Sequence, residues 1–441
     1  MDWDGLGNEA VGLLREYIRI DTSNPPGNEV LGAKFIAEIL EAEDIPFRFY
    51  ESAPGKVSVA ARLEGAGRGK PLVLMNHIDV VPAEAEKWAV HPFSGELSDG
   101  FIWGRGALDM KGMGIMELMA TIAAKRAGLR LSRDLVFLAC ADEETGGEFG
   151  CGHLLENHRA DFEADLVINE GGFANTSLIP GAPLFMVACA EKYALWLRLS
   201  AKGQGGHGSM PSGRGALERL VVALSRLIAV EQPIEITGPT RELFATLSGH
   251  WPLLEPFARN GSVDTLQELM AEYNLAAIPA VNAMIRNTIS LNILNSGVKV
   301  NVIPDAAEAD LDCRLMPETD ADEFAEAVRD ALDDPEIDVE VVLRGIETRP
   351  SPTGGGFFDV LRKTVEDSFP GAITTPFMLP GMSDSRFFRR LGVPVYGIIS
   401  ARLGLEELAT VHGVNEKISV EDVKDGVRFM YALVEACAGS R

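Results

Sequence analysis

Short runs of uninterrupted apolar residues constrain the fold of this chain more than any other feature. Three such runs lie in the first 190 residues, at 72–75, 135–139 and 166–168, and a similar run follows at 394–399. Segments with helical periodicity lie between them. A strand that is apolar on both faces needs cover on both faces, which is typical of a mostly parallel sheet with helices on each side. The outer parts of the chain therefore predict an α/β fold.

The middle of the chain has a different pattern. Apolar and polar residues alternate over 193–199, 307–315 and 337–343, and helical patterns lie between these segments. Alternation with period two indicates an antiparallel sheet that is covered on one face only. We therefore predict an α+β domain at 192–346, inserted into a domain formed by 1–191 and 347–441. Residues 237–285 read as helical with proline breaks, and their role is left open.

Charge and cysteine content exclude some classes of partner. The 441 residues include 40 Lys and Arg against 65 Asp and Glu, a net charge of −25. A chain this acidic repels phosphate backbones and anionic lipids, so we expect neither nucleic-acid nor membrane partners. The N-terminal stretch lacks the pattern of a secretory signal, and five scattered cysteines form no CxxC pair. We therefore expect a cytoplasmic protein with buried free thiols.

Polar residues with metal-binding chemistry follow the apolar runs. The carboxyl ends of parallel strands meet at one edge of a sheet, where ligands bind. Taken singly, each His or carboxylate is more often a satisfied polar pair than a metal ligand. Together they predict a metal site at this edge. The residues are His77 and Asp79 after the first run, Glu143 and Glu144 after the second, Glu170 after the third, Asp109 in the glycine-rich segment 99–112, and His412 near the end.

The order of these motifs resembles a known family. The chain contains, in sequence, LMNHIDVVP, W-x-x-H-P-F-S-G, DGFIWGRGALDMKG, DEETGG, NEGG, GGHGSMP and a late HG. This pattern is similar to that of the zinc exopeptidase/acylase family, which includes glutamate carboxypeptidase, aminoacylase, acetylornithine deacetylase and succinyl-diaminopimelate desuccinylase. The resemblance implies a dizinc amide hydrolase with a catalytic domain at 1–191 and 347–441. It also implies that 192–346 is a lid and dimerisation domain of a homodimer.

The resemblance assigns a ligand set for two zinc ions. It implies His77 and Glu170 for one ion, Glu144 and His412 for the other, and Asp109 as the carboxylate shared between them. Two Zn²⁺ carry four positive charges against three carboxylates, and the surplus favours ionising a bridging water. Cobalt or manganese would also suit oxygen and nitrogen donors.

Three further residues take catalytic roles by the same resemblance. Glu143 and Glu144 are adjacent, so in an extended segment their side chains point oppositely and one can ligate while the other acts as a base. The resemblance makes Glu143 the general base and Asp79 the residue that orients His77. It also implies that His207 reaches across a dimer interface to stabilise the oxyanion of the tetrahedral intermediate. The alternative is that His207 is a solvated loop residue.

Four positions are candidates for binding substrate. Arg314 lies on the polar side of its expected strand, where it either clamps a substrate carboxylate or forms a surface ion pair. Asn301 matches a family position that touches substrate. Gly381 and Ser383 lie in a segment, GMSDSR, that resembles the family's G-G-T-D-A-R turn. Met382 and Ser383 depart from that form, which leaves the shape of the pocket open.

The sequence thus predicts a hydrolase that cleaves an amide bond next to a free α-carboxylate. Its mechanism would use metal-bound hydroxide and a glutamate base. In the family that the chain resembles, Glu rather than Asp at the position of Glu170 goes with carboxypeptidases and acylases, which implies a peptide or N-acyl amino acid as substrate. A dipeptidase or aminopeptidase and a deacetylase or desuccinylase are the alternatives within the class. Outside it stand a nicotinamide oxidoreductase, because 203–208 matches G-x-G-x-x-G, and an inactive binding scaffold.

Overall fold

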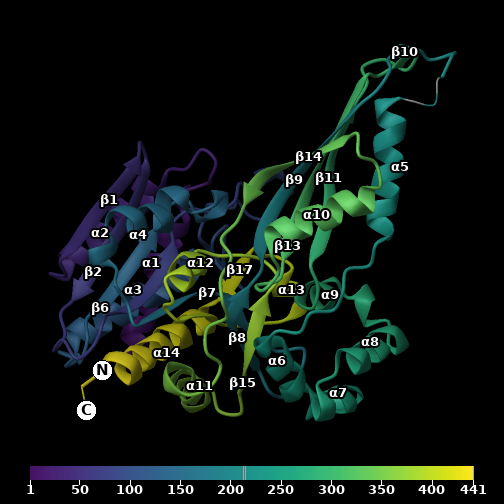
Figure 1. The fold of residues 1–441 in the computed structure, drawn as a ribbon. Helices are drawn as coiled ribbons and strands as arrows, with labels where there is room; N and C mark the ends of the chain where they lie inside the picture. The colour runs from purple at the N-terminus through teal and green to yellow at the C-terminus, as the bar shows by residue number, and fades with distance from the viewer. Residues whose placement is uncertain (212, 214, 441) are drawn as a thin grey trace. The chain divides into compact units, whose positions relative to one another are not determined.

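The structure is a computed structural model that describes residues 1–211, 213 and 215–440. The chain forms two compact units (Figure 1). The first comprises Met1–Cys189, Ser351–Phe377 and the chain from Ser383 onward. The second comprises Ala190–Pro350 and the short segment Met378–Met382. The chain therefore leaves the first unit and returns to it twice.

An eight-stranded sheet is the frame of the first unit. In order across the sheet, its strands are β1 (Phe47–Ala53), β2 (Lys56–Leu63), β6 (Leu135–Cys140), β3 (Leu72–His77), β7 (Leu166–Asn175), β16 (Val395–Leu403), β8 (Leu184–Glu191) and β15 (Ile373–Leu379). The central strands β6, β3, β7 and β16 run parallel. Every residue of β3 and β6 is buried. These strands confirm the mostly parallel sheet expected from the uninterrupted apolar runs.

Helices cover both faces of this sheet. Its helices are α1 (Trp3–Ile18), α2 (Glu29–Ala42), α3 (Lys111–Arg126), α4 (His153–Asn157), α11 (Gly356–Ser368), α12 (Ser385–Arg390), α13 (Leu405–Leu408) and α14 (Val420–Ala438). Side chains alternate along β6, and Leu135 and Phe137 join the core formed with α1, α3, α11 and α14. The other face meets α12, where Ser385 accepts a 2.9 Å hydrogen bond from Asn169 of β7. Helical cover on both faces explains why these strands contain so few polar residues.

The second unit contains a four-stranded antiparallel sheet. Its order is β11 (Thr288–Ser296), β13 (Ala306–Leu315), β9 (Tyr193–Lys202) and β14 (Ile337–Arg344). The inward side chains of these strands form one core with α5 (Ala216–Ala229) and α10 (Ala321–Leu332). The predicted alternation ends early in β14. Val341 is 41% exposed, and the register with β9 shifts between Val341 and Leu343, which marks a bulge at the point where the alternation ends.

Two further parts of the second unit follow its sheet. The segment predicted as helical at 237–285 contains α6 (Gly238–Ser248), α7 (Glu255–Asn260), α8 (Val263–Glu272) and α9 (Pro279–Met284), which confirms that interpretation. At the end of the long strands, β10 (Gly206–His207) pairs with β12 (Val302–Ile303). No helix among the described residues is long and apolar enough to cross a lipid bilayer.

Candidate dimetal centre

Seven side chains meet at the carboxyl edge of the parallel strands in the first unit. His77 is the last residue of β3, Glu143 and Glu144 follow β6, and Glu170 lies in β7. Asp109 comes from the loop just before α3. A methyl group on Gly112 in the first turn of this helix would lie 2.2 Å from the carbonyl oxygen of Ala107, so only glycine fits where the loop folds back. The other two side chains are Asp79, just after β3, and His412, from the loop that follows α13.

The ligand atoms form two groups that share one carboxylate. In the first group, His77 Nε2 lies 3.1 Å from Asp109 Oδ1 and 3.6 Å from Glu170 Oε1. In the second, His412 Nε2 lies 3.0 Å from Asp109 Oδ2 and 3.4 Å from Glu144 Oε2. Within each group the ligand atoms all lie within 4.8 Å of one another. Asp109 thus faces one histidine with each of its oxygens.

This donor set fits a pair of divalent cations. Imidazole nitrogens and carboxylate oxygens are the ligands that zinc accepts, and a carboxylate with two free oxygens can bridge two ions. None of the ion pairs among the described residues gives Asp109, Glu144 or Glu170 a lysine or arginine partner. Three carboxylates that converge without a basic side chain leave negative charge that cations can neutralise.

The pKa shifts of Asp109, His412 and Glu170 arise from the same crowding of buried carboxylates and histidines. Burial alone would raise the pKa of Asp109, but hydrogen bonds with His412 and His77 hold it well below its usual range. Hydrogen bonds with Asp109 and Glu144 raise the pKa of His412 to about 10. Burial, reinforced by the charge of Asp109, raises the pKa of Glu170 well above its ordinary value. The cluster therefore favours positive charge, whether as protons or as metal ions.

Asp79 holds the turn that carries Glu143 and Glu144. Its carboxylate accepts hydrogen bonds from the main-chain N–H groups of both glutamates, at 3.2 and 3.1 Å, and from Asn24 Nδ2 at 2.8 Å. His77 Nδ1 lies 2.9 Å from the main-chain oxygen of Asp79 and 3.6 Å from its carboxylate. Asp79 thus fixes the ring on one side and the turn on the other.

The segment around Glu143 and Glu144 differs from the expected extended chain. Asp142 adopts a left-handed conformation with φ of 73°, and residues 143–145 form a single 3₁₀ turn. In such a turn the side chains of neighbouring residues are separated by about a third of a rotation rather than by half. The expectation that the side chains of Glu143 and Glu144 point in opposite directions was therefore wrong. Of the two, only Glu144 belongs to a group of ligand atoms.

Glu416 organises the centre without belonging to it, and no role was predicted for it. Its buried carboxylate accepts hydrogen bonds from the main-chain N–H groups of Gly106, Leu108 and Asp109, at 3.1, 2.7 and 3.0 Å. It also pairs with Arg105 at 2.6 Å. Arg105 in turn donates to the main-chain oxygen of Gly413 at 2.7 Å. These contacts tie the loop of Asp109 to the loop of His412.

Replacing Glu416 with alanine is expected to lower the free energy of unfolding by about 3–5 kcal/mol, because Arg105 would be left as a buried, unpaired cation. Denaturant unfolding with zinc present measures this loss. The exposed Glu435→Ala in α14 is the matched control and should cost little. Equal stability of the two variants would mean that Glu416 does not hold the loops together.

The other predicted site residues lie elsewhere. Ser383 is buried in the first unit. His207 and Asn301 lie at the two-stranded antiparallel pair β10–β12 of the second unit, where Gly208 N donates to Asn301 O at 2.9 Å. His207 and Asn301 are both exposed. Arg314 of β13 pairs with Asp312 through two hydrogen bonds of 2.9 and 3.2 Å. Gly381 belongs to the return segment of the second unit.

The glycine-rich segment 203–208 does not form a dinucleotide cradle. A nucleotide-binding G-x-G-x-x-G connects a buried parallel strand to a helix whose first turn binds the phosphates. Here Gly206 and His207 instead pair in antiparallel register with Ile303 and Val302. The segment therefore forms one strand of a two-stranded antiparallel pair, and the oxidoreductase alternative loses its only motif.

Comparison with known proteins agrees with this geometry. A model of Peptidase family M20/M25/M40 matches residues 73–436. The chain is 32% identical over 375 residues to N-fatty-acyl-amino acid synthase/hydrolase PM20D1 of Homo sapiens. The aligned region covers 83% of this chain and 74% of that protein. It is 26% identical over 444 residues to Aminoacylase-1B of Rattus norvegicus, covering 97% and 95%.

A solved structure shows the same fold. The M20 family metallo-carboxypeptidase Sso-CP2 from Sulfolobus solfataricus superposes with a TM-score of 0.74 at 20% identity, covering 97% of this chain and 98% of that one. The family match extends over most of the chain and includes all five ligand candidates of the centre, from His77 to His412. This chain therefore belongs to peptidase family M20/M25/M40 and is a hydrolase that acts on amide bonds.

Proposed function

We propose that this protein hydrolyses the amide bond of N-acyl amino acids with the help of two zinc ions. One ion would be held by His77 and Glu170, the other by Glu144 and His412, and Asp109 would bridge them. The observation that carries the proposal is the pair of donor groups that share the two oxygens of Asp109. The names of the relatives favour an acyl group over a second amino acid on the amine.

Glu143 is the residue that moves the proton in this proposal. When bound, a pair of zinc ions polarises the scissile carbonyl and makes a water easier to ionise. The carboxylate of Glu143 takes the proton of the attacking water and delivers it to the nitrogen of the leaving amino acid. Burial raises the pKa of Glu143 well above its ordinary value; His77 lowers it and the charge of Asp384 raises it further. A raised pKa suits a group that must first accept and then donate a proton.

Recognition of the α-carboxylate falls to the second unit in this proposal. Arg314 uses its Nε and Nη2 atoms on Asp312, and its Nη1 makes no hydrogen bond with any described residue. We assign that nitrogen to the substrate carboxylate. Asn301, Gly381 and Ser383 are proposed to contact substrate, and His207 to stabilise the oxyanion from the partner subunit of a homodimer.

The second unit also offers a surface for that homodimer. Helix α5 packs on β9 and β13, and it leaves Val221, Val222 and Ile228 between 48% and 67% exposed. Strand β11 is an edge of the sheet, and an edge strand can pair with its copy in another chain. Light scattering in solution would give the mass of the assembly. All five cysteines are buried and none forms a disulfide, which supports the proposed cytoplasmic location.

A substrate panel tests the proposed activity. Long-chain acyl-, acetyl- and succinyl-amino acids would be offered beside dipeptides and their C-terminal amides. We expect hydrolysis of N-acyl amino acids that have a free carboxylate, loss of turnover in a chelator, and recovery on addition of Zn²⁺.

Two outcomes would contradict this proposal. Hydrolysis that persists after the metal content has been driven to zero would exclude the dimetal mechanism. Equal turnover of a substrate and its C-terminal amide would exclude recognition of the α-carboxylate, while leaving the metal centre itself intact. Preference for dipeptides over every N-acyl amino acid would replace the acyl substrate with a peptide.

A further inference from the structure

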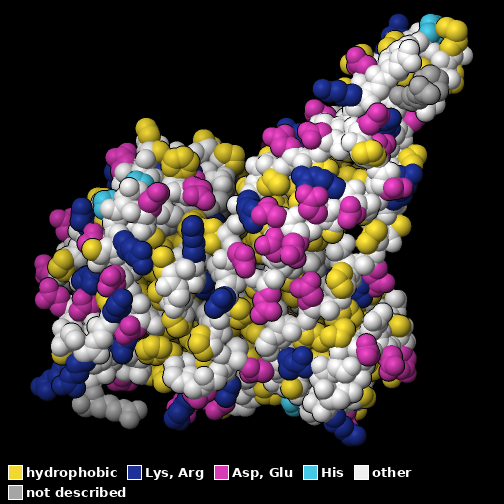
Figure 2. Space-filling view, viewed as in Figure 1, with side chains coloured by type: hydrophobic (Ala, Val, Ile, Leu, Met, Phe, Trp, Pro, Cys, Tyr) yellow, Lys and Arg dark blue, Asp and Glu magenta, His cyan; other side chains and the backbone are white. Residues whose placement is uncertain are grey.

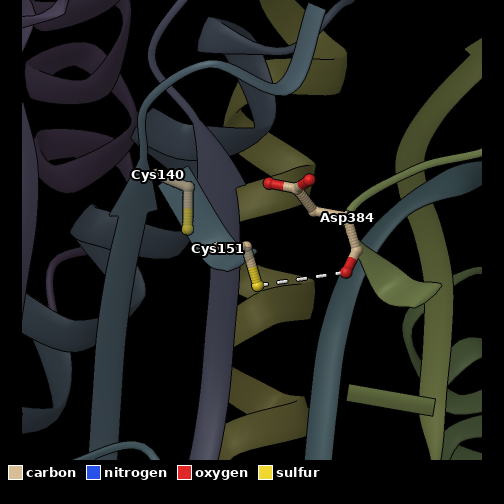
Figure 3. A group of neighbouring side chains, drawn as sticks. All are labelled: Cys140, Cys151 and Asp384. Carbon is tan, nitrogen blue, oxygen red and sulfur yellow. Dashed lines mark hydrogen bonds between the residues drawn. The ribbon is translucent and has the colours of Figure 1, made fainter. Parts of the chain in front are cut away.

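Two cysteines and an aspartate form a second polar cluster in the first unit. Cys140 is the last residue of β6, Cys151 lies in the five-residue turn Glu148–Gly152, and Asp384 immediately precedes α12. Their two sulfurs and a carboxylate oxygen all lie within 4.8 Å of one another. Figure 3 shows Cys151 between the other two, with the carboxylate of Asp384 directed back toward the cysteines. No residue of this cluster is a ligand candidate of the dimetal centre.

The carboxylate of Asp384 lacks a hydrogen-bond partner in this cluster. The residue is 2% exposed, and neither carboxylate oxygen makes a hydrogen bond with the described residues. The nearest cation is Arg386, whose Nη2 lies 3.8 Å from Oδ1. Its guanidinium donates instead to the main-chain oxygens of Ser383 and Gly146. A buried carboxylate without hydrogen bonds requires a physical explanation, and a bound ion is one that fits a carboxylate flanked by two thiols.

Most of the donor atoms around the carboxylate of Asp384 are sulfurs, which are soft metal ligands. Cys151 Sγ lies 3.8 Å from Met75 Sδ and 4.0 Å from the main-chain oxygen of Asp384. The cluster therefore offers two thiols, one thioether and two kinds of oxygen. Thiolates prefer thiophilic ions such as zinc and cadmium over magnesium or calcium. The dimetal centre contains no sulfur, so the two places differ in the ions that they favour.

The spacing of these donors is close to that of a bound ion. Zinc lies about 2.3 Å from a thiolate sulfur and about 2.0–2.2 Å from a carboxylate oxygen. Two sulfurs on one ion can therefore be separated by no more than about 4.6 Å. A tetrahedral site brings two sulfurs to about 3.8 Å from each other, so ligand atoms that lie within 4.8 Å of one another would close in on the ion by up to about 1 Å.

We propose that Cys140, Cys151 and Asp384 bind a thiophilic divalent cation of the zinc and cadmium type, as a third metal site of this protein. Both thiols lose their protons to solvent on binding, and Asp384 binds as the carboxylate. No atom changes its oxidation state. Met75 Sδ and the main-chain oxygen of Asp384 are the available fourth donors.

The position of the site links it to catalysis. Cys140 and Cys151 lie on either side of the segment that carries Glu143 and Glu144. A methyl group on Gly147 in this segment would lie 2.1 Å from Asp384 Oδ1, so the carboxylate packs directly against the turn. An ion bound here would cross-link the end of β6 to the far side of that turn. It would therefore restrain the glutamates without contacting substrate.

Cobalt absorption tests the proposal without measuring turnover. Reduced protein that holds two equivalents of Zn²⁺ would be titrated with Co²⁺ under a phosphine reductant. We expect one further equivalent to bind with a thiolate-to-cobalt charge-transfer band, which a centre of nitrogen and oxygen donors cannot produce. Cys140→Ser and Cys151→Ser should each lose the band. Asp384→Asn should weaken binding at least about 10–100-fold, the loss typical when a ligand's neighbour is removed.

The control variant is Cys437→Ser, a buried thiol in α14 that should leave the band unchanged. If the cluster variants fail to fold, Cd²⁺ offers a second measurement on the wild-type protein. In urea below the unfolding transition, Cd²⁺ should slow alkylation of Cys140 and Cys151 but not of Cys437.

Three results would overturn the site. The first is the absence of a charge-transfer band at any excess of Co²⁺, and the second is a band that survives in Cys151→Ser. The third is a Cys140–Cys151 disulfide in the protein as isolated, detected by mass spectrometry and reversed by reductant, which would assign the pair a redox role. Because each result is independent of substrate hydrolysis, failure here would leave the proposed amidase activity standing.

Discussion

Replacing Glu143 with glutamine should lower kcat by about 10²–10⁴-fold, the usual contribution of a general acid–base group. Glutamine keeps the size and the hydrogen-bonding oxygen of the side chain, but it cannot accept the proton of the attacking water. Glu143 is outside both groups of ligand atoms, so both metal ions should stay bound. The measurement is kcat for an N-acyl amino acid together with the metal content per chain.

The matched control for this change is Glu148→Gln. Glu148 is an exposed acid in the same connection between β6 and α4, and its replacement removes one negative charge from the same region. We expect kcat within about twofold of wild type, since exposed charges act weakly through solvent. Normal turnover in the Glu143 variant would remove the assignment of the base, whereas loss of metal would place Glu143 among the ligands.

Replacing Asp109 with asparagine should have the larger effect, with loss of both ions and of detectable turnover. Asp109 is the only residue present in both groups of ligand atoms among the described residues. The substitution removes the negative charge that His77 and His412 both contact, and an amide nitrogen cannot bind a cation. Metal content after dialysis and calorimetric titration with Zn²⁺ measure the loss.

Asp99→Asn is the control for this substitution. Asp99 lies in the same glycine-rich segment and is exposed, with φ of 53°, a conformation that asparagine tolerates well. That variant should keep two ions and normal activity. Two tightly bound ions in Asp109→Asn would show that the carboxylate does not bridge. One bound ion would show that the two groups fill independently.

Much of the architecture could be predicted from hydrophobic pattern alone. The run at 135–139 has no polar position, so it had to be a strand covered on both faces, and it became β6. Figure 2 shows acidic side chains over the surface of both units, in keeping with the net charge of −25. His77, Glu144, Glu170 and Asp109 could be recognised because they come at the end of an apolar run or in a glycine-rich segment, where polar residues stand out. His412 was recognised only from its place in the order of family motifs.

Residues that act by supporting others could not be predicted in this way. Glu416 accepts a hydrogen bond from Asp109 N, which lies 307 positions earlier in the sequence. Nothing in the sequence around Glu416 distinguishes it from the other Asp and Glu residues, of which the chain has 65 in all. The turn at Glu143 was misread for a related reason. Its shape depends on the left-handed Asp142 and on hydrogen bonds from Asp79, which are tertiary features rather than local preferences.

The link between Glu416 and the loop of Asp109 also sets the order in which the centre can form. During synthesis, residues 105–109 leave the ribosome long before the acceptor for their N–H groups exists. Until residues 412–416 are made, this loop lacks both its anchor Glu416 and His412, the second of the two histidines that face Asp109. The centre therefore stays incomplete until the segment that carries His412 and Glu416 has been made and has packed against this loop.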